Sequence, residues 1–393
     1  MSAPLNASRP TRSAWIGVAG ALVAGSLSWT CRPPATNDQT GANFDHSALL
    51  RSIVEQVILP AHTRAELCAT DLVSAVRLYR LANDGEPRKS ARKVAQNAWR
   101  QMMWAWQAEE MLQLGPAGSE ATMLGGEGLR DEIYSWPTTN GCRIDQEIVK
   151  QGYENDDFTE VNLINVYGMD ALEYLLFNES PENSCAETIP INTEDSWDAL
   201  GVIALEERRA NYALQVSEQL QRTVRALHST WVESFADQLM HTGDGSVYPT
   251  DHDALNDLFS AVFYLDLQTK DKKMTAPLES PWAEHSGENI CANLLTMQHI
   301  YWGGPSAEEG IGLDDSLNGI GEHDLALEVD QAIVIARETC DDMSFPLVER
   351  LSDAPSQVKD LHDDIKTITD LLKTSVVLAL SLDLPSDGAG DAD

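Results

Sequence analysis

The chain has 393 residues, of which 43% are hydrophobic, so it is long enough to bury a sizeable core. Its 62 Asp and Glu residues outnumber 27 Lys and Arg residues, which gives a formal net charge of −35 at pH 7. Such a chain repels nucleic acid and anionic membrane surfaces, and its field concentrates cations. We therefore expect no nucleic-acid partner.

The N-terminus is typical of a targeting segment. Two arginines precede the apolar run Ala14–Leu27, which is too short to span a bilayer comfortably. The run leads into Cys31 in a context that resembles a bacterial lipoprotein signal, with Cys31 as the acylated residue. We expect residues 1–31 to be a signal peptide of lipoprotein type and residues 32–44 to be a flexible tether. An ordinary exported protein is the alternative. The lipid would be the only attachment to a membrane.

Apolar residues recur at helical spacing through most of the chain, and no run alternates apolar and polar residues as a strand would. We therefore predict an all-α fold. Pro60 is expected to kink or split the first helix. The expected helices are His46–Leu81, Lys89–Leu114, Leu129–Trp136, Arg143–Lys150, Thr159–Phe177, Trp197–Met240, Asp253–Leu267, Gly287–Tyr301, Leu325–Cys340 and Val358–Leu382.

A glycine-containing turn at Thr242–Ser246 ends the longest predicted helix and marks a predicted domain boundary. We expect an N-terminal helical bundle over residues 45–242, a C-terminal bundle over 243–385 and an acidic tail over 386–393. In both halves a Gly-Pro pair ends a helix and is followed later by an Asp-Gln pair. An internal duplication of a four-helix-bundle-like domain would explain this repetition.

Export permits disulfides, and the chain has six cysteines. If Cys31 carries lipid, an odd number remains, so at least one thiol stays unpaired or pairs with another molecule. Cys142 and Cys185 lie in loop-like contexts on either side of Thr159–Phe177, and we expect them to pair. Cys291 with Cys340 is a second candidate pair. Cys68 is expected to be a buried structural thiol.

Two acids stand within the apolar stripe of the predicted helix Thr159–Phe177. Asp170 and Glu173 are three residues apart and project from nearly the same face. Gly168 costs a helix roughly 1 kcal/mol relative to Ala unless something must approach the backbone there. Carboxylates suit hard cations such as Ca²⁺, Mn²⁺ or Fe³⁺. The stretch therefore indicates a cation site.

Two further acids could complete such a site across the bundle. Glu110 lies on the neighbouring Trp-rich helix, and Asp145 follows it in the chain. Facing helices commonly supply the carboxylates of metal sites in bundle cores. The alternative is that Arg130 or Arg143 neutralises these acids in a buried polar network.

The aromatic residues near this site have two interpretations. Trp99, Trp104, Trp106 and Trp136 are expected to pack in the core beneath it. The alternative is a groove for a sugar or polymer. A zinc peptidase would favour a His-Glu-x-x-His motif, and the nine His residues include no pair at helical spacing. We therefore favour binding over catalysis.

Several linked motifs together resemble the imelysin-like family of exported bacterial proteins, over roughly residues 45 to 390. The family's signature is Gly-x-His-x-x-Glu; Gly168 and Glu173 match it, and Asp170 stands in place of the His. The motifs that carry the resemblance are Trp106–Glu110 followed by Gly115–Ala117, Leu129–Pro137, Cys142–Gln146, Gly168–Phe177 and Asp370–Thr374.

The resemblance implies a two-domain helical protein in the periplasm or on the outer membrane of a Gram-negative bacterium. The family takes its name from an insulin-cleaving peptidase, and other members are linked to iron uptake, some as the soluble component of a ferrous-iron importer. We therefore expect a non-catalytic protein that binds iron or another divalent or trivalent cation. The expected partners are an outer-membrane receptor or an inner-membrane permease.

The expected metal ligands are Asp170, Glu173, Glu110 and Asp145, and the expected supporting residues are Gly168, Arg130 and Trp136. A metallopeptidase of imelysin type is the alternative function. A surface module that binds a protein or polymer partner is a further alternative.

Overall fold

The computed structural model describes residues 44–343 and 346–384. The predicted signal peptide, the acylation site Cys31, most of the tether and the acidic tail lie outside the described residues. The described residues belong to one compact unit, Gly41–Asp393. The boundary near residue 242 and the internal duplication stay predictions.

The described residues form helices and no strand, which confirms the all-α prediction. None of the described helices combines the length and apolar character of a membrane span. The α-helices are α1 (His46–Ile53), α2 (Leu59–Leu81), α3 (Glu86–Glu110), α4 (Leu129–Ile133), α5 (Gly141–Lys150), α6 (Phe158–Val161), α7 (Gly168–Phe177), α8 (Pro190–Thr193), α9 (Gly201–Thr230), α10 (Ala236–Met240), α11 (Asp251–Val262), α12 (Ser286–Trp302), α13 (Leu313–Gly319), α14 (His323–Asp342), α15 (Leu347–Asp353), α16 (Pro355–Leu371) and α17 (Val377–Leu380).

Short π-helical segments continue several of these helices. They are η1 (Val54–Ile58), η6 (Trp231–Phe235), η7 (Leu265–Lys270) and η8 (Leu372–Val376). Pro60 does not split the helix, because η1 joins α1 directly to α2. A kink there stays a prediction. Pro60 lies in the first turn of α2. Because Pro60 has no N–H to donate to the preceding turn, it fits directly after a π-helical segment, where the Leu59 N–H already reaches five residues back to the Val54 carbonyl.

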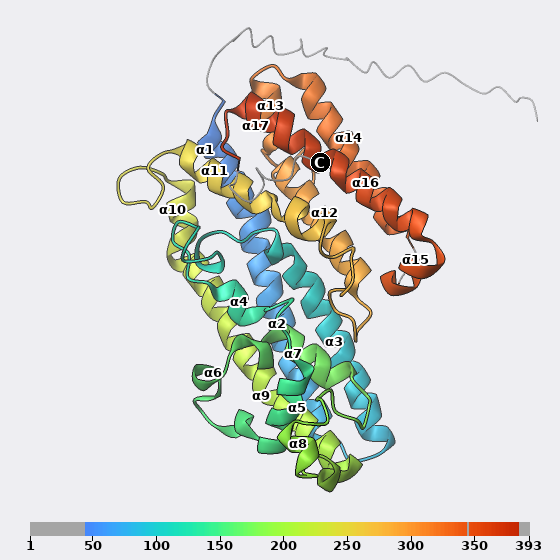
Figure 1. The fold of residues 1–393 in the computed structure, drawn as a ribbon. Helices are drawn as coiled ribbons and strands as arrows, with labels where there is room; N and C mark the ends of the chain where they lie inside the picture. The colour runs from blue at the N-terminus through green and yellow to red at the C-terminus, as the bar shows by residue number, and fades with distance from the viewer. Residues whose placement is uncertain (1–43, 344–345, 385–393) are drawn as a thin grey trace, which may run out of the picture. The chain divides into compact units, whose positions relative to one another are not determined.

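The helix α3 lies between two groups of helices, one that contains α2, α7 and α9 and another that contains α12, α14 and α16 (Figure 1). On one side, α2 packs against α3 and α9, and the shorter α7 packs on α3 and α9. On the other side, α12 packs against α3 and α14, and α14 packs against α16. This arrangement places the C-terminal end of α3 next to segments from both parts of the chain.

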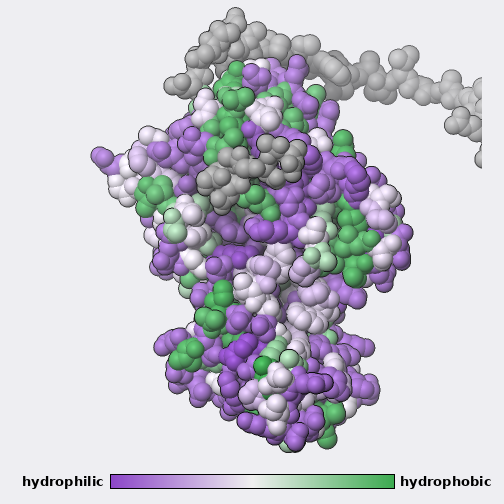
Figure 2. Space-filling view, in the orientation of Figure 1, coloured by the Kyte–Doolittle hydropathy of each residue, from purple (hydrophilic) through white to green (hydrophobic). Residues whose placement is uncertain are grey.

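The core contains most of the predicted aromatic cluster. Trp99 and Trp106 are fully buried, and the Trp99 indole N–H donates to the Met169 carbonyl at 2.9 Å. Trp104 is 39% exposed, so its expected place in the core is wrong. Figure 2 shows a face on which hydrophilic residues predominate and apolar residues form separate small patches.

The signature stretch is not the single helix Thr159–Phe177 that its pattern predicts. It forms α6, a 3₁₀ turn at Ile164–Val166 and then α7, which begins at Gly168. Gly168 has a φ of +85°, and a Cβ there would lie 2.8 Å from the carbonyl oxygen of Ile133. The glycine is therefore required because another backbone segment approaches at the start of the helix.

Candidate functional site

Asp170 lies in the first turn of α7 and is buried. Its Oδ2 accepts hydrogen bonds from the main-chain N–H of Ser135 at 2.8 Å and from the Ser135 hydroxyl at 3.2 Å. Burial raises the pKa of Asp170 to about 6, although the bond from the Ser135 N–H opposes the rise. Asp170 thus holds the segment that follows α4.

Glu173 lies one turn further along α7 and is also buried. Its Oε1 accepts from the main-chain N–H groups of Trp282 at 2.9 Å and Ala283 at 2.8 Å. Burial raises its pKa well above the usual range, and the charge of Asp170 raises it further. Glu173 thus holds the segment that precedes α12. Both signature acids connect α7 to main-chain N–H groups elsewhere in the fold.

Glu110, at the end of α3, is fully buried and makes an ion pair with Arg130, with Nη2 and Oε2 3.0 Å apart. The Tyr264 hydroxyl donates to the same carboxylate at 2.8 Å. Burial would lower the pKa of Arg130, but Glu110 more than offsets this and the pKa is raised. Arg130 therefore neutralises Glu110, which is the alternative that the sequence left open. Arg143 pairs instead with Glu147.

Asp145 on α5 belongs to a different set of contacts. Its Oδ2 accepts from the Tyr174 hydroxyl at 2.8 Å and from the Ser184 N–H at 2.7 Å. The disulfide between Cys142 and Cys185, which the sequence predicts, is present beside it.

The second candidate pair, Cys291 with Cys340, is also bonded, and Cys68 is a buried free cysteine. Two disulfides fit an exported protein.

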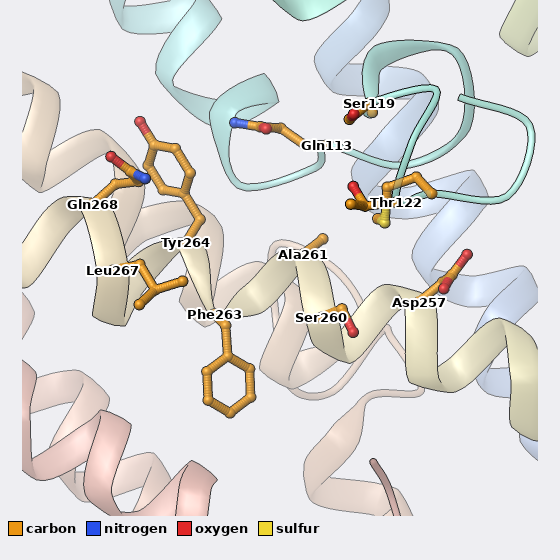
Figure 3. A pocket seen from close by; sticks show the side chains of 12 residues that line it. Gln113, Ser119, Thr122, Asp257, Ser260, Ala261, Phe263, Tyr264, Leu267 and Gln268 are labelled. Atoms are coloured by element: carbon orange, nitrogen blue, oxygen red, sulfur yellow. The ribbon is translucent and has the colours of Figure 1, made fainter. Parts of the chain in front are cut away.

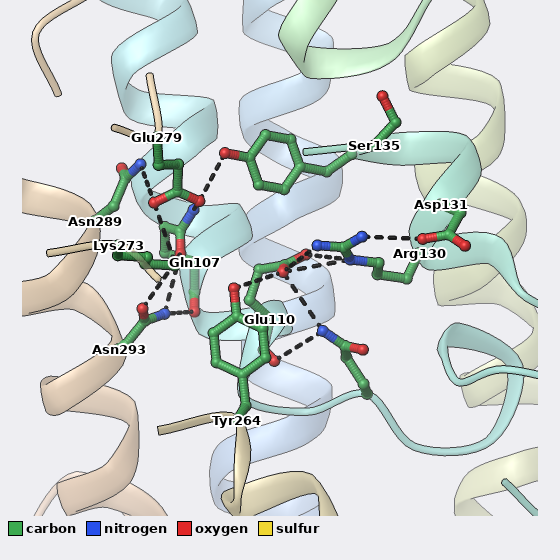
Figure 4. A network of polar contacts seen from close by, with 12 residues as sticks. Gln107, Glu110, Arg130, Asp131, Ser135, Tyr264, Lys273, Glu279, Asn289 and Asn293 are labelled. Carbon is green, nitrogen blue, oxygen red and sulfur yellow. Dashed lines mark hydrogen bonds and ion pairs between the residues drawn. The ribbon is translucent and has the colours of Figure 1, made fainter. Parts of the chain in front are cut away.

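A buried polar network that the sequence did not predict lies next to Glu110 (Figure 4). Lys273 is fully buried, and its Nζ lies 3.2 Å from Glu279 Oε2 and 2.9 Å from Asn293 Oδ1 and also contacts Gln107. The Tyr134 hydroxyl donates to Glu279 at 2.6 Å. In the sequence, only Gln107, a polar residue on an apolar helix face, indicated a buried polar network. Lys273 and Glu279 lie in loop-like sequence and gave no such indication.

The four predicted metal ligands are each engaged by donors of the chain itself. A cation at Glu110 would have to displace the Arg130 guanidinium and the Tyr264 hydroxyl. Within residues 44–343 and 346–384, no group of three or more His, Cys, Asp or Glu residues is placed to hold a metal ion. The four acids therefore do not fit a resident metal centre in this arrangement, and their role as ligands stays a prediction.

Two adjoining cavities open beside these residues, and we call them together the site cleft. The first has a volume of about 360 Å³ and is lined by Arg130, Ser135 and Trp136 among others. The second, of about 350 Å³, shares four lining residues with it: Gln113, Ser119, Tyr264 and Gln268. Figure 3 shows Gln113, Ser119 and Thr122 opposite the segment that carries Asp257 to Gln268. Because Asp170 binds Ser135, a signature acid holds one wall of the cleft.

Comparisons with known proteins place the chain in a family. The family model for imelysin matches residues 58–374. No curated protein sequence matches the chain. A solved structure of a "putative iron-regulated protein A precursor" from Parabacteroides distasonis has a TM-score of 0.69 and 17% identity, over 88% of this chain and 96% of that one. An imelysin-like protein from Psychrobacter arcticum has a TM-score of 0.65 and 16% identity, over 86% and 96%.

At these identities the solved structures show a shared fold. The family match covers most of the chain, including the signature helix and the site cleft. This chain therefore belongs to the imelysin family.

Proposed function

We propose that this protein takes part in iron acquisition outside the cytoplasm, and that it binds metal-containing cargo in the site cleft without catalysing a reaction. The observation that carries the proposal is the bond between Asp170 and Ser135, which ties the family's signature helix to the wall of the cleft. Asp170, which stands where the family motif has His, then maintains the shape of a binding site, with Arg130 and Trp136 in its lining.

The contacts of the two signature acids support a role in binding rather than in catalysis. A general acid or base must reach the reacting group of a substrate. Asp170 and Glu173 instead accept hydrogen bonds from main-chain N–H groups, and both are buried. In this proposal their carboxylates act on cargo indirectly, by fixing the segments around the cleft.

The link to iron comes from the relatives. One solved structure of this fold is named as an iron-regulated protein, which is a statement about that protein. We extend it to this chain as a proposal. The protein would be located in the periplasm or on the outer membrane, with a lipid on Cys31 as its anchor. A receptor in the outer membrane or a permease in the inner membrane would pass on the cargo.

The proposal is tested by calorimetric titration of the protein with Fe³⁺ supplied as its nitrilotriacetate complex, and with Fe²⁺ and Mn²⁺ salts. Ser119 is exposed and lines both cavities, so Ser119→Trp places a large ring in the cleft at little cost to folding. Ser74→Trp is the matched control, because Ser74 is an exposed residue of α2 outside the cleft. We expect Ser119→Trp to weaken binding at least about tenfold, which corresponds to about 1.4 kcal/mol, and Ser74→Trp to leave it unchanged.

Absence of binding for all three probes, or equal binding by both variants, would overturn the proposal. The metallopeptidase alternative has its own readout, which is cleavage of a denatured protein that a chelator abolishes. Cleavage of this kind would replace the binding proposal with the peptidase one.

A further inference from the structure

A third cavity, separate from the site cleft, has several basic side chains in its lining. It lies at the start of α3, has a volume of about 330 Å³, and is lined by Arg88, Lys89, Arg92 and Lys93. Three glutamates also line it, so basic side chains outnumber acidic ones there. In the whole chain, by contrast, 62 acidic residues outnumber 27 basic ones. The local reversal of charge needs an explanation.

The arginines of this cavity are held in place by the fold. Arg92 is buried, and its Nε and Nη2 donate to the carbonyls of Leu176 at 2.6 Å and Asn178 at 2.9 Å. Arg88 donates from Nε and Nη2 to the Ala82 carbonyl and pairs with Asp84 at 3.2 Å, whereas its Nη1 is buried without a hydrogen-bond partner. Arg92 makes no ion pair with another described residue, so its fixed guanidinium is ready to bind an anion with little further loss of conformational entropy.

Arg209 on α9 lies beside Arg92, since both guanidinium groups donate to the Asn178 carbonyl. It is 2% exposed, and its Nε and Nη2 have no hydrogen-bond partner. Burial lowers its pKa, and the charge of the neighbouring Arg92 contributes to this. Two buried guanidinium groups that repel each other are both stabilised when an anion binds near them.

The lysines of the cavity are only weakly engaged. Lys89 pairs with Glu86 at 3.4 Å, and both side chains are mostly exposed, so the pair contributes little. Lys93 is exposed and makes no ion pair with another described residue. The first turn of α3 also lacks a side-chain cap, since Gly85 occupies the N-cap position. The positive end of a helix dipole adds to the attraction for an anion.

We propose that this basic cavity binds a phosphate group. Guanidinium pairs match the oxygens of phosphate, and flexible lysines at the rim add point charges. The phosphate could belong to a small soluble anion or to the head group of a phospholipid, because the chemistry of recognition is the same.

The test is calorimetric titration of the full mature protein at low salt with inorganic phosphate and with pyrophosphate. The variant is Lys89→Gln/Lys93→Gln, which changes two exposed side chains and leaves the buried arginines intact. The control is Lys359→Gln/Lys366→Gln on α16, which removes the same charge elsewhere. We expect the first variant to bind at least about tenfold more weakly than the control. Flotation with phosphatidylglycerol vesicles, compared with phosphatidylcholine vesicles, distinguishes a lipid source from a soluble one.

Binding of soluble phosphate or of phosphatidylglycerol vesicles that depends on Lys89 and Lys93 supports the proposal and identifies the source. Absence of binding to every probe overturns it. Equal weakening in both lysine variants also overturns it, because only the overall charge would then matter. The result is independent of iron binding, since no probe contains a metal.

Discussion

Glu173 on α7 accepts a hydrogen bond from the main-chain N–H of Ala283 at 2.8 Å, although the two residues are 110 positions apart in the chain. The same oxygen accepts from the Trp282 N–H at 2.9 Å. One carboxylate thus satisfies two main-chain donors that lie just before α12. This contact gives Glu173 a structural task in this chain.

Replacing Glu173 with Ala should destabilise the fold, because two N–H groups would lose their acceptor. We expect a loss of about 2–6 kcal/mol in the free energy of unfolding, since each of the two unsatisfied groups costs about 1–3 kcal/mol. Glu173→Gln keeps an oxygen acceptor and should retain most of the stability. Urea unfolding measures both, with Glu160→Ala on the exposed side of α6 as the control. Equal stability of Glu173→Ala and the control would contradict the structural role.

Asp170 should make stability depend on pH in a defined window. Its pKa is raised from 3.8 to about 6 in the folded state, so the folded protein keeps a proton that the unfolded chain has lost. This favourable contribution is complete below pH 3.8 and disappears as the pH rises through about 6. The loss is at most about 3 kcal/mol, from 1.36 kcal/mol for each pKa unit.

Asp170→Asn provides the comparison, because it cannot titrate and still offers an oxygen to the Ser135 N–H. Between pH 4 and pH 6.5 the wild type should lose more stability than this variant does. If the two unfolding free energies stay parallel across that range, Asp170 titrates at its ordinary pKa, which would contradict this prediction.

Gly168→Ala should be strongly destabilising. The position has a φ of +85°, and the added Cβ would lie 2.8 Å from the Ile133 carbonyl oxygen. Gly201→Ala is a matched control, because Gly201 also has a positive φ, of +67°, and nothing lies within 4 Å of its Cβ position. Backbone strain costs about 1–3 kcal/mol at both positions. Thermal unfolding should show a larger loss at Gly168, and an equal loss would remove the close approach as its cause.

The disulfide between Cys142 and Cys185 should contribute substantially to stability. It links residues 43 positions apart, and the chain-entropy treatment gives about 4 kcal/mol for a loop of that length. The Cys142→Ala/Cys185→Ala variant should unfold at a correspondingly lower urea concentration. The same variant should also loosen the contact between Asp145 and the Ser184 N–H, which hydrogen exchange at Ser184 would report. Unchanged exchange there would separate the disulfide from the neighbouring polar contacts.

Most helices could be predicted from the sequence, because their apolar residues follow the period of a helix that buries one face. The predicted and observed bounds of α12 and α14 differ by a few residues at most. The start of α7 could not be predicted in this way. Gly168 begins that helix because the backbone at Ile133 approaches it, and such a contact leaves no periodic pattern in the sequence.

The candidate site was predicted less well than the fold. The sequence identified the acids Asp170, Glu173 and Glu110, and the structure buries all three. Their partners are main-chain N–H groups and Arg130, and a main-chain donor has no residue type by which it can be found. The buried Lys273 and Glu279 come together only through the fold, since neither lies in a distinctive motif.

The most direct test of the proposed role is to locate iron in crystals soaked with Fe³⁺ nitrilotriacetate, by anomalous scattering at the iron absorption edge. We predict a peak in the site cleft, with the carboxylates of the chelate facing Arg130 and with the bonds from Ser135 to Asp170 and from Ala283 to Glu173 intact. A peak coordinated by the carboxylate oxygens of Asp170 and Glu173 themselves, with those bonds broken, would contradict the account.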